Sequence, residues 1–446
     1  MPANGSPTRI KVPLHKRLLH RVFGGESSRV FRGMVVLTAG SSLAKLVGLV
    51  AIPLITRLYT PEDFGVMAVY TALIAMLLPL MTLRYALALP LPRHDGVAMN
   101  IMALSVGVLL VLGITLTVLL AVFSAPLLSF LSMEFLIPWW WLIILGMFSA
   151  GVYELLTLWA TRKRDYKIIA RTQVTQSLAG NGVKIGLGLL IMGPLGLLVG
   201  QLVAKSGGIG TMLRAFITGF RANWRHVRYR RMVFLARYYA TFPLYRVPSQ
   251  FLLAFAMQAP VFFIAVHFSS AEAGQFALAM TVIALPVTLI AQSAGKAFLG
   301  EAAKVGAKNQ AKLQRMTVDV IQKTALMSLV PAVILFWFGE PLFVLVFGHD
   351  WQVAGLFASN LSIYLFFHFI SNPIQHVFQI VGRNDLYFQQ VLRRAIMIVG
   401  VFTTAYLLDL DAALTVLVYA LVMSLHYGIV CAIALRTVGW RFQANK

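Results

Sequence analysis

Charged residues are scarce in this sequence, at 12% of 446 residues, whereas 59% are hydrophobic and the mean hydropathy is +0.80. Soluble domains carry about 25% charged residues. No stretch of the chain is polar enough to form a soluble domain, so most of it must face lipid. The single cysteine, Cys431, excludes an intramolecular disulfide and a thiolate metal cluster. We expect it to be an ordinary buried apolar side chain.

Acidic residues are scarcer still, because 15 acidic and 38 basic residues give a formal net charge of +23. In a soluble protein this excess suggests a nucleic-acid partner. Here the basic residues lie in short blocks between apolar runs, which is typical of cytoplasmic loops beside an anionic leaflet. No aromatic-interleaved basic platform of the kind that binds nucleic acid is present, so we expect membrane lipids and no nucleic acid as partners.

Catalytic motifs are lacking as well. The sequence contains no GxxxxGKS or GxxxxGKT motif that would cradle a nucleotide phosphate. Paired carboxylates and Ser/His/Asp groups do not gather on one side of the predicted topology, and the loops on the side opposite the basic blocks are short. A glycosyltransferase or polymerase would need a larger loop. We therefore expect no enzyme, no catalytic residue, no metal and no cofactor.

The apolar runs have the length of membrane spans, for which about 20 residues are needed. Twelve runs fit, at residues 34–57, 66–89, 98–123, 136–160, 171–192, 194–214, 240–267, 276–299, 319–346, 355–380, 389–408 and 412–435. Basic blocks fall on every second connection, so both termini are predicted to be cytoplasmic. In the basic N-terminal tail, Leu14, Leu18 and Val22 recur at helical spacing, which fits an interfacial helix; a disordered tail is the alternative.

The two halves resemble each other weakly. The matched segments, in chain order, are 59–65 with 268–274, 123–127 with 338–342, and 164–166 with 384–386. They predict two six-helix bundles around a central cavity, in an all-α polytopic fold of about twelve transmembrane helices. Each half has an even number of spans, so the halves run parallel, and the substrate is expected between them. The expected units are a basic cytoplasmic or interfacial segment 1–33, an N-terminal bundle 34–214, a basic cytoplasmic linker 215–239, a C-terminal bundle 240–435 and a cytoplasmic tail 436–446.

Three stretches resemble the polysaccharide transporter (Wzx-type) branch of the multidrug/oligosaccharidyl-lipid/polysaccharide (MOP) exporter superfamily. They are GSSLAKLVGLVAIPLITRLYTPEDFGVMAVY, LWATRKRDYKIIARTQV and PSQFLLAFAMQAPVFFIAVHFSSAEAGQFALAMTV. The resemblance extends over nearly the whole chain. Its motifs are specific for the branch and do not identify a substrate.

The resemblance implies a flippase of the bacterial inner membrane. Such a protein moves undecaprenyl-pyrophosphate-linked oligosaccharide from the cytoplasmic to the periplasmic leaflet by alternating access, for O-antigen of lipopolysaccharide, capsule or exopolysaccharide. A polysaccharide polymerase and a chain-length regulator are the protein partners that it implies. The alternatives are a drug/cation antiporter of the same superfamily, a lipid II flippase, and a membrane-embedded polymerase or ligase. Acids should dominate the cavity of a cation antiporter, and this chain has the opposite balance.

Charged residues inside predicted spans cost about 2.5–3.5 kcal/mol each on insertion scales, so each needs a reason. The cations expected to bind a pyrophosphate headgroup or an anionic glycan are Lys45, Arg84, Lys184, Arg246 and Lys296. Arg and Lys donate charge-assisted hydrogen bonds to phosphate oxygens. The alternative is snorkelling toward the interface, most plausibly for the two cations near span ends, Arg84 and Lys296.

Two further residues within predicted spans can titrate. Glu154 is the clearest acid deep within a span, and His368 lies on the tenth span. We expect Glu154 either to pair with one of the buried cations or, like His368, to couple transport to a proton or sodium gradient.

Overall fold

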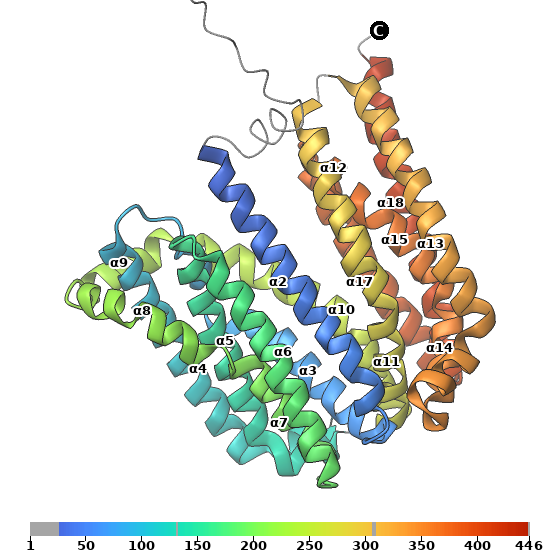
Figure 1. The fold of residues 1–446 in the computed structure, drawn as a ribbon, viewed down its shortest axis with the longest axis horizontal. Coiled ribbons are helices and arrows are strands. Elements are labelled where there is room, and N and C mark those ends of the chain that lie inside the picture. Colours follow the sequence, from blue (N-terminus) through green and yellow to red (C-terminus); the bar gives the residue numbers. More distant parts are fainter. Residues whose placement is uncertain (1–25, 131–132, 306–308, 445–446) are drawn as a thin grey trace, which may run out of the picture.

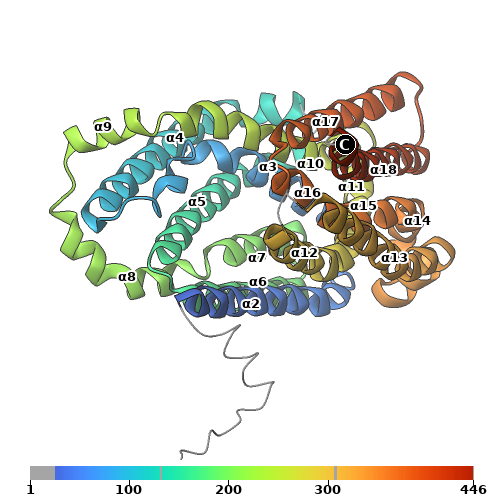
Figure 2. The ribbon, with the colours of Figure 1, turned by 90° about the horizontal axis from the view of Figure 1, so that it is seen from above.

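A computed structural model describes residues 26–130, 133–305 and 309–444 of the chain. Within these ranges the ordered elements are all helices, and they form two neighbouring groups (Figures 1 and 2). The interfacial helix expected around Leu14 lies outside the described residues.

The first group is an N-terminal bundle of six helices. They are α2 (Glu26–Ile55), α3 (Pro61–Met81), α4 (Asp95–Phe130), α5 (Trp140–Arg162), α6 (Tyr166–Leu189) and α7 (Pro194–Ser206), with short 3₁₀ turns η1 (Tyr85–Ala88) and η2 (Glu134–Trp139). Two further helices, α8 (Ile209–Trp224) and α9 (Tyr229–Tyr238), then lead to the second group.

The second group contains the remaining helices, several of them broken. They are η3 (Phe242–Arg246) with α10 (Val247–His267); α11 (Ser270–Pro286), η4 (Val287–Ala291) and α12 (Gln292–Val305); α13 (Gln310–Phe347); η5 (His349–Trp351) with α14 (Gln352–Asn360), α15 (Ser362–Ile374) and α16 (His376–Ile380); α17 (Asn384–Leu407); and α18 (Ala412–Ala444). The segments η3 and η4 are π-helical turns that join their neighbours into longer rods.

Each of the twelve predicted spans has a helical counterpart. Nine helical segments of the described chain are long and apolar enough to cross a membrane, and the bent pair His349–Asn360 and Ser362–Ile380, which turns by 54°, gives a tenth. The other two counterparts are α6 and α7, which pack against each other. Helix α6 is less apolar than the other spans because it contains many polar side chains, and α7 is too short to cross a membrane by itself because it has only 13 residues.

The sixth predicted span, 194–214, differs from the structure. The helix ends at Ser206, and a separate helix, α8, begins at Ile209. The break falls at Gly207-Gly208, where the missing side chains lower helix propensity. Part of the predicted linker, 215–239, is helical: it contains the end of α8 and the whole of α9, both of which are strongly amphipathic and rich in arginine.

The start of α2 and the end of α18 lie at the same end of the molecule, which we call the basic end (Figure 1). The α5–α6 connection, with Arg162, Lys163 and Arg164, also lies there. The opposite end, called the neutral end, contains the turns that precede α3 and α11. The chain therefore separates its charges between two faces, as a multi-pass membrane protein does.

At the neutral end, α3 and α11 begin in the same way. The side chain of Thr60 accepts a hydrogen bond from the backbone N–H of Asp63, and that of Ser269 accepts one from Glu272. These caps satisfy backbone donors that a helix start otherwise leaves free. Because 59–65 and 268–274 were matched as repeats, the two bundles contribute equivalent helix starts to this end.

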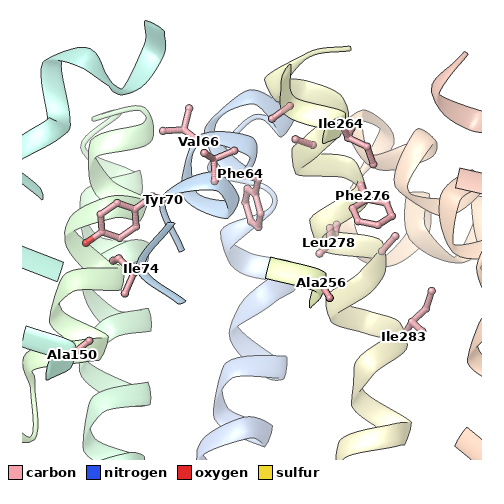
Figure 3. Close-up of a cluster of buried hydrophobic side chains, with 14 of the residues drawn as sticks. Phe64, Val66, Tyr70, Ile74, Ala150, Ala256, Ile264, Phe276, Leu278 and Ile283 are labelled. Carbon is pink, nitrogen blue, oxygen red and sulfur yellow. The ribbon is translucent and has the colours of Figure 1, made fainter. Parts of the chain in front are cut away.

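The two helix starts touch through glycines. A Cβ atom at Gly65 would collide with the backbone carbonyl of Ser270, and one at Gly274 would collide with that of Pro61. Close by, the Trp351 indole N–H donates to the Thr56 carbonyl oxygen at 2.9 Å. Core residues of both bundles, including Phe64 and Phe276, meet in one buried cluster (Figure 3). The bundles are therefore closed against each other at the neutral end.

We predict that Gly65→Val opens this contact, because the added side chain cannot coexist with the Ser270 carbonyl. The reporter is a cysteine at the fully buried Ala273, in a Cys431→Ala background. A membrane-impermeant maleimide should label this cysteine in the Gly65→Val protein and leave it unlabelled in the parent.

Gly182→Val is the matched control, since a Cβ there has no neighbour within 4 Å. Equal protection of the reporter in the Gly65→Val and control proteins would show that this contact does not hold the neutral end closed.

Candidate functional site

Arg84 links the two bundles at the end of α3. After Met81, Leu83 and Arg84 both adopt positive φ, at 43° and 57°. Such left-handed conformations cost about 1–2 kcal/mol for a residue with a side chain. In this turn the Arg84 Nη1 atom lies 2.6 Å from Glu154 Oε1 on α5, and its Nη2 donates to Gln250 Oε1 on α10 at 3.3 Å. One guanidinium thus contacts both bundles.

The Arg84–Glu154 ion pair is largely enclosed, with 11% and 20% of the two side chains exposed. Its polar atoms are incompletely matched, because Arg84 Nε and Glu154 Oε2 are buried without a hydrogen-bond partner in the structure. Buried polar atoms normally have partners. Of the two roles expected for Glu154, the structure shows the charge partner. Arg84 has its charge balanced and is not a free phosphate-binding cation in this conformation.

Lys45 on α2 and Lys296 on α12 belong to opposite bundles, and their charges interact. Both side chains are exposed, and their ammonium groups are near enough to repel each other. The two helices lie side by side in both views (Figures 1 and 2). Neither lysine belongs to any ion pair seen among the described residues. Two like charges that repel each other favour the binding of an anion between them.

Lys184 lies inside the N-terminal bundle, between α6 and α7. Its Nζ donates to Gln201 Oε1 at 3.0 Å, and its backbone carbonyl accepts a 2.6 Å hydrogen bond from the Tyr59 hydroxyl. Burial raises the pKa of Tyr59 to about 12, so the hydroxyl keeps its proton and remains a donor. The Lys184 side chain is 9% exposed. Its surroundings are those of a helix–helix contact, and the structure does not bring it together with Lys45 and Lys296.

Arg246 ends the π-helical turn η3, just before α10. Its side chain is exposed. The structure places it on the second bundle, one helical turn before Gln250, the residue that accepts a hydrogen bond from Arg84.

His368 lies in the second bundle, on α15. Its ring stacks on Tyr427 with centroids 4.8 Å apart and lies 5.2 Å from the Tyr364 ring. The guanidinium of Arg394, on α17, interacts with the hydroxyls of the same tyrosines.

Arg394 is not among the residues that the sequence analysis predicted as a site. The available signal was its position, since it falls inside the predicted span 389–408.

Among the described residues, no group of three or more His, Cys, Asp and Glu side chains is placed to hold a metal ion.

Comparison with solved structures defines the fold of the protein. The chain superposes on the lipid II flippase MurJ in an inward closed conformation, with a TM-score of 0.67 and 11% identity over 92% of this chain and 88% of that one. It also resembles the MATE multidrug transporter DinF-BH, with a TM-score of 0.57 and 16% identity over 98% and 99% of the two chains. An inward-facing multidrug resistance MATE family transporter of the MOP superfamily gives a TM-score of 0.56 and 16% identity over 92% and 94%. The fold is that of the MOP transporters, and the predicted twelve-helix, two-bundle architecture is confirmed.

Residues 54–355 match the model of the polysaccharide biosynthesis protein family, so the chain belongs to that family. The family match and the shared fold agree with the resemblance to the polysaccharide transporter branch that the sequence predicted. No match was found among curated protein sequences.

We predict that Glu154→Gln destabilises the protein, because it leaves the Arg84 charge enclosed without its partner. Breaking a buried pair costs about 3–5 kcal/mol, and the partial exposure of this pair brings the expected loss to about 2–3 kcal/mol. The measurement is thermal unfolding of the purified protein in detergent.

The double variant Arg84→Gln/Glu154→Gln removes both charges and should recover part of the lost stability. The effects of substitutions at the two residues of one ion pair do not add. If the losses of the two single variants simply add in the double variant, the pair contributes no coupling energy.

Proposed function

We propose that the protein is a flippase for undecaprenyl-pyrophosphate-linked oligosaccharide. It moves the lipid from the cytoplasmic to the periplasmic leaflet of the bacterial inner membrane, for O-antigen, capsule or exopolysaccharide synthesis. Membership of the polysaccharide biosynthesis family supports a saccharide cargo. The observation that carries the proposal is the pair Lys45 and Lys296, two exposed cations on opposite bundles that repel each other and take part in no ion pair seen in the described chain.

A pyrophosphate group is a suitable ligand for the two ammonium groups of Lys45 and Lys296. It is anionic at neutral pH and accepts charge-assisted hydrogen bonds from ammonium groups. Binding between α2 and α12 would replace repulsion of the two lysines by attraction of both to one ligand. The oligosaccharide would then occupy the space between the bundles, while the polyprenyl chain remains in lipid. Arg246 and Lys184 are assigned supporting parts, Arg246 at the entrance to α10 and Lys184 in holding α6 against α7.

The contacts between the bundles support alternating access. At the neutral end they are closed by backbone-to-backbone packing of Gly65 and Gly274. Nearer the basic end, Arg84 reaches Gln250 through one 3.3 Å hydrogen bond. The basic end faces the cytoplasm in this proposal, because loops rich in Lys and Arg stay on that side. The lipid-linked cargo would enter there, and the glycine contact would separate to release it on the other side.

The state of Glu154 supports a flippase better than it supports a cation antiporter. A cation-binding cavity requires unpaired carboxylates, whereas Glu154 is ion-paired with Arg84 at 2.6 Å. Glu154 becomes free only when Arg84 is drawn to a phosphate, and at that moment it could take up a proton. Coupling to a proton gradient would then pass through this pair. A polysaccharide polymerase and a chain-length regulator are the protein partners that this pathway implies.

The test is flipping of a fluorescent undecaprenyl-pyrophosphate-linked oligosaccharide in reconstituted vesicles. We expect Lys45→Gln or Lys296→Gln to lower the rate at least tenfold, which corresponds to about 1.4 kcal/mol of lost stabilisation. Lys45→Arg and Lys296→Arg should retain most of the rate, because the charge is kept.

The matched control is Lys323→Gln, a 67% exposed lysine on α13 that pairs with Asp319. A normal flipping rate in both lysine variants would contradict the proposed role of the pair. A parent protein that flips lipid II and not the oligosaccharide lipid, or that lowers drug susceptibility without flipping either, would replace the proposed cargo by that of the corresponding relatives.

A further inference from the structure

A second group of polar side chains lies inside the C-terminal bundle, apart from the residues discussed above as the cargo site. It is formed by three helices: Tyr364 and His368 come from α15, Arg393 and Arg394 from α17, and Tyr419, His426 and Tyr427 from α18. We call it the Arg394 cluster. It contains two guanidinium groups, two imidazoles and three phenols, and no carboxylate.

The rings of the cluster form one packed wall. Tyr364 lies 5.8 Å from Tyr427 and 6.1 Å from Tyr419, measured between ring centroids, and His426 lies 5.1 Å from Tyr427. Tyr364 and Tyr419 are almost fully buried. The wall is therefore fixed by core packing and does not depend on a bound ligand for its shape.

The guanidinium of Arg394 is set against this wall. It interacts electrostatically with the hydroxyls of Tyr364, Tyr419 and Tyr427. Protein surrounds Arg394 and His368 on nearly all sides, yet each keeps some accessible surface. A space at least as wide as a water molecule therefore lies beside them.

The donors of the cluster exceed its acceptors. Arg394 Nε and Arg393 Nη2 are both buried and have no hydrogen-bond partner in the structure. Arg393 Nε donates a 3.4 Å hydrogen bond to His426 Nδ1, which is a neutral acceptor. Neither arginine takes part in an ion pair seen in the described chain. A guanidinium stays charged in any protein environment.

An enclosed cation without a counter-ion is unfavourable by several kcal/mol, and phenol dipoles offset only part of this. Elsewhere in the chain an enclosed arginine has its acid, as Arg84 has Glu154. The missing element at Arg394 is therefore a negative charge, and the unpaired N–H groups are available to hold it.

We propose that the Arg394 cluster is a binding site for a small monovalent anion, either a halide or a carboxylate. Arg394 Nε and Arg393 Nη2 supply charged donors, and the hydroxyls of Tyr419 and Tyr427 supply neutral donors around the same space. A halide would be an ion taken up from solution. A carboxylate would be carried by an acidic sugar. In both cases the bound charge balances Arg394 and stiffens α15, α17 and α18 as one unit.

The test measures thermal unfolding of the purified full-length protein in potassium HEPES at constant ionic strength. Potassium chloride and potassium glucuronate are titrated separately. We expect a saturable rise in Tm with at least one of them. Chloride alone acting would identify an inorganic ion, glucuronate alone an acidic sugar, and both together a site shared by the two.

The variants assign the effect to the cluster. Arg394→Gln should weaken the apparent affinity at least tenfold, and Tyr419→Phe, which removes one hydroxyl from the packed wall, should weaken it a few-fold. Tyr419→Phe also keeps the proposal testable if Arg394→Gln fails to fold. Lys323→Gln, on the exposed surface of the same bundle, should respond like the parent.

A parent protein whose Tm does not change saturably with either anion would overturn the proposal. So would an Arg394→Gln or Tyr419→Phe variant that keeps the full shift at unchanged affinity. This proposal does not depend on the cargo, because the measurement involves no lipid-linked substrate and no transport.

Discussion

The arrangement of the two bundles depends on the contact between α3 and α11 at the neutral end. Gly65 and Gly274 leave room for the opposing backbones, and any side chain at either position would push the helices apart. Both glycines follow the same type of capped helix start, so the contact is made from equivalent parts of the two halves. Glycine at helix–helix contacts is favoured in membranes, where packing and not the hydrophobic effect brings helices together. This contact closes the neutral end of the molecule, and the charged side chains discussed above lie elsewhere, between and within the bundles.

The cations within the helices have different partners. Arg84 has an acid, Glu154, at 2.6 Å, and Lys184 has an amide, Gln201, at 3.0 Å. Lys45 and Lys296 have each other, which is unfavourable, and Arg394 has only phenols. An anion would relieve the repulsion between Lys45 and Lys296, and it would balance the enclosed charge of Arg394, so these two arrangements are the places where an anion from outside the chain would bind. One of them lies between the bundles and the other inside one bundle, which separates the proposed cargo site from the proposed ion site.

Sequence patterns located the helices well. Runs of about 20 apolar residues predicted all twelve, and the Thr60-Pro61 and Ser269 helix starts appeared within the matched repeats. The sixth span was placed less well, because its window averaged over Gly207-Gly208 and joined α7 to α8. Among the candidate cations, sequence could not separate Lys45, which is exposed, from Lys184, which is enclosed by α6 and α7. Both are lysines in the middle of apolar helices, and only the rotation of each helix distinguishes them.

The sequence by itself determined that the chain spans the membrane many times and that its basic residues separate to one face. These properties follow from composition and periodicity, which are local. Tertiary structure alone decided that Glu154 pairs with Arg84, 70 residues away, that Gly65 meets Ser270, and that Arg394 lies among three tyrosines of other helices. The physical reason is that these contacts join helices distant in sequence. Which side chains meet is set by how those helices are rotated and how closely their backbones approach, and no single segment encodes either.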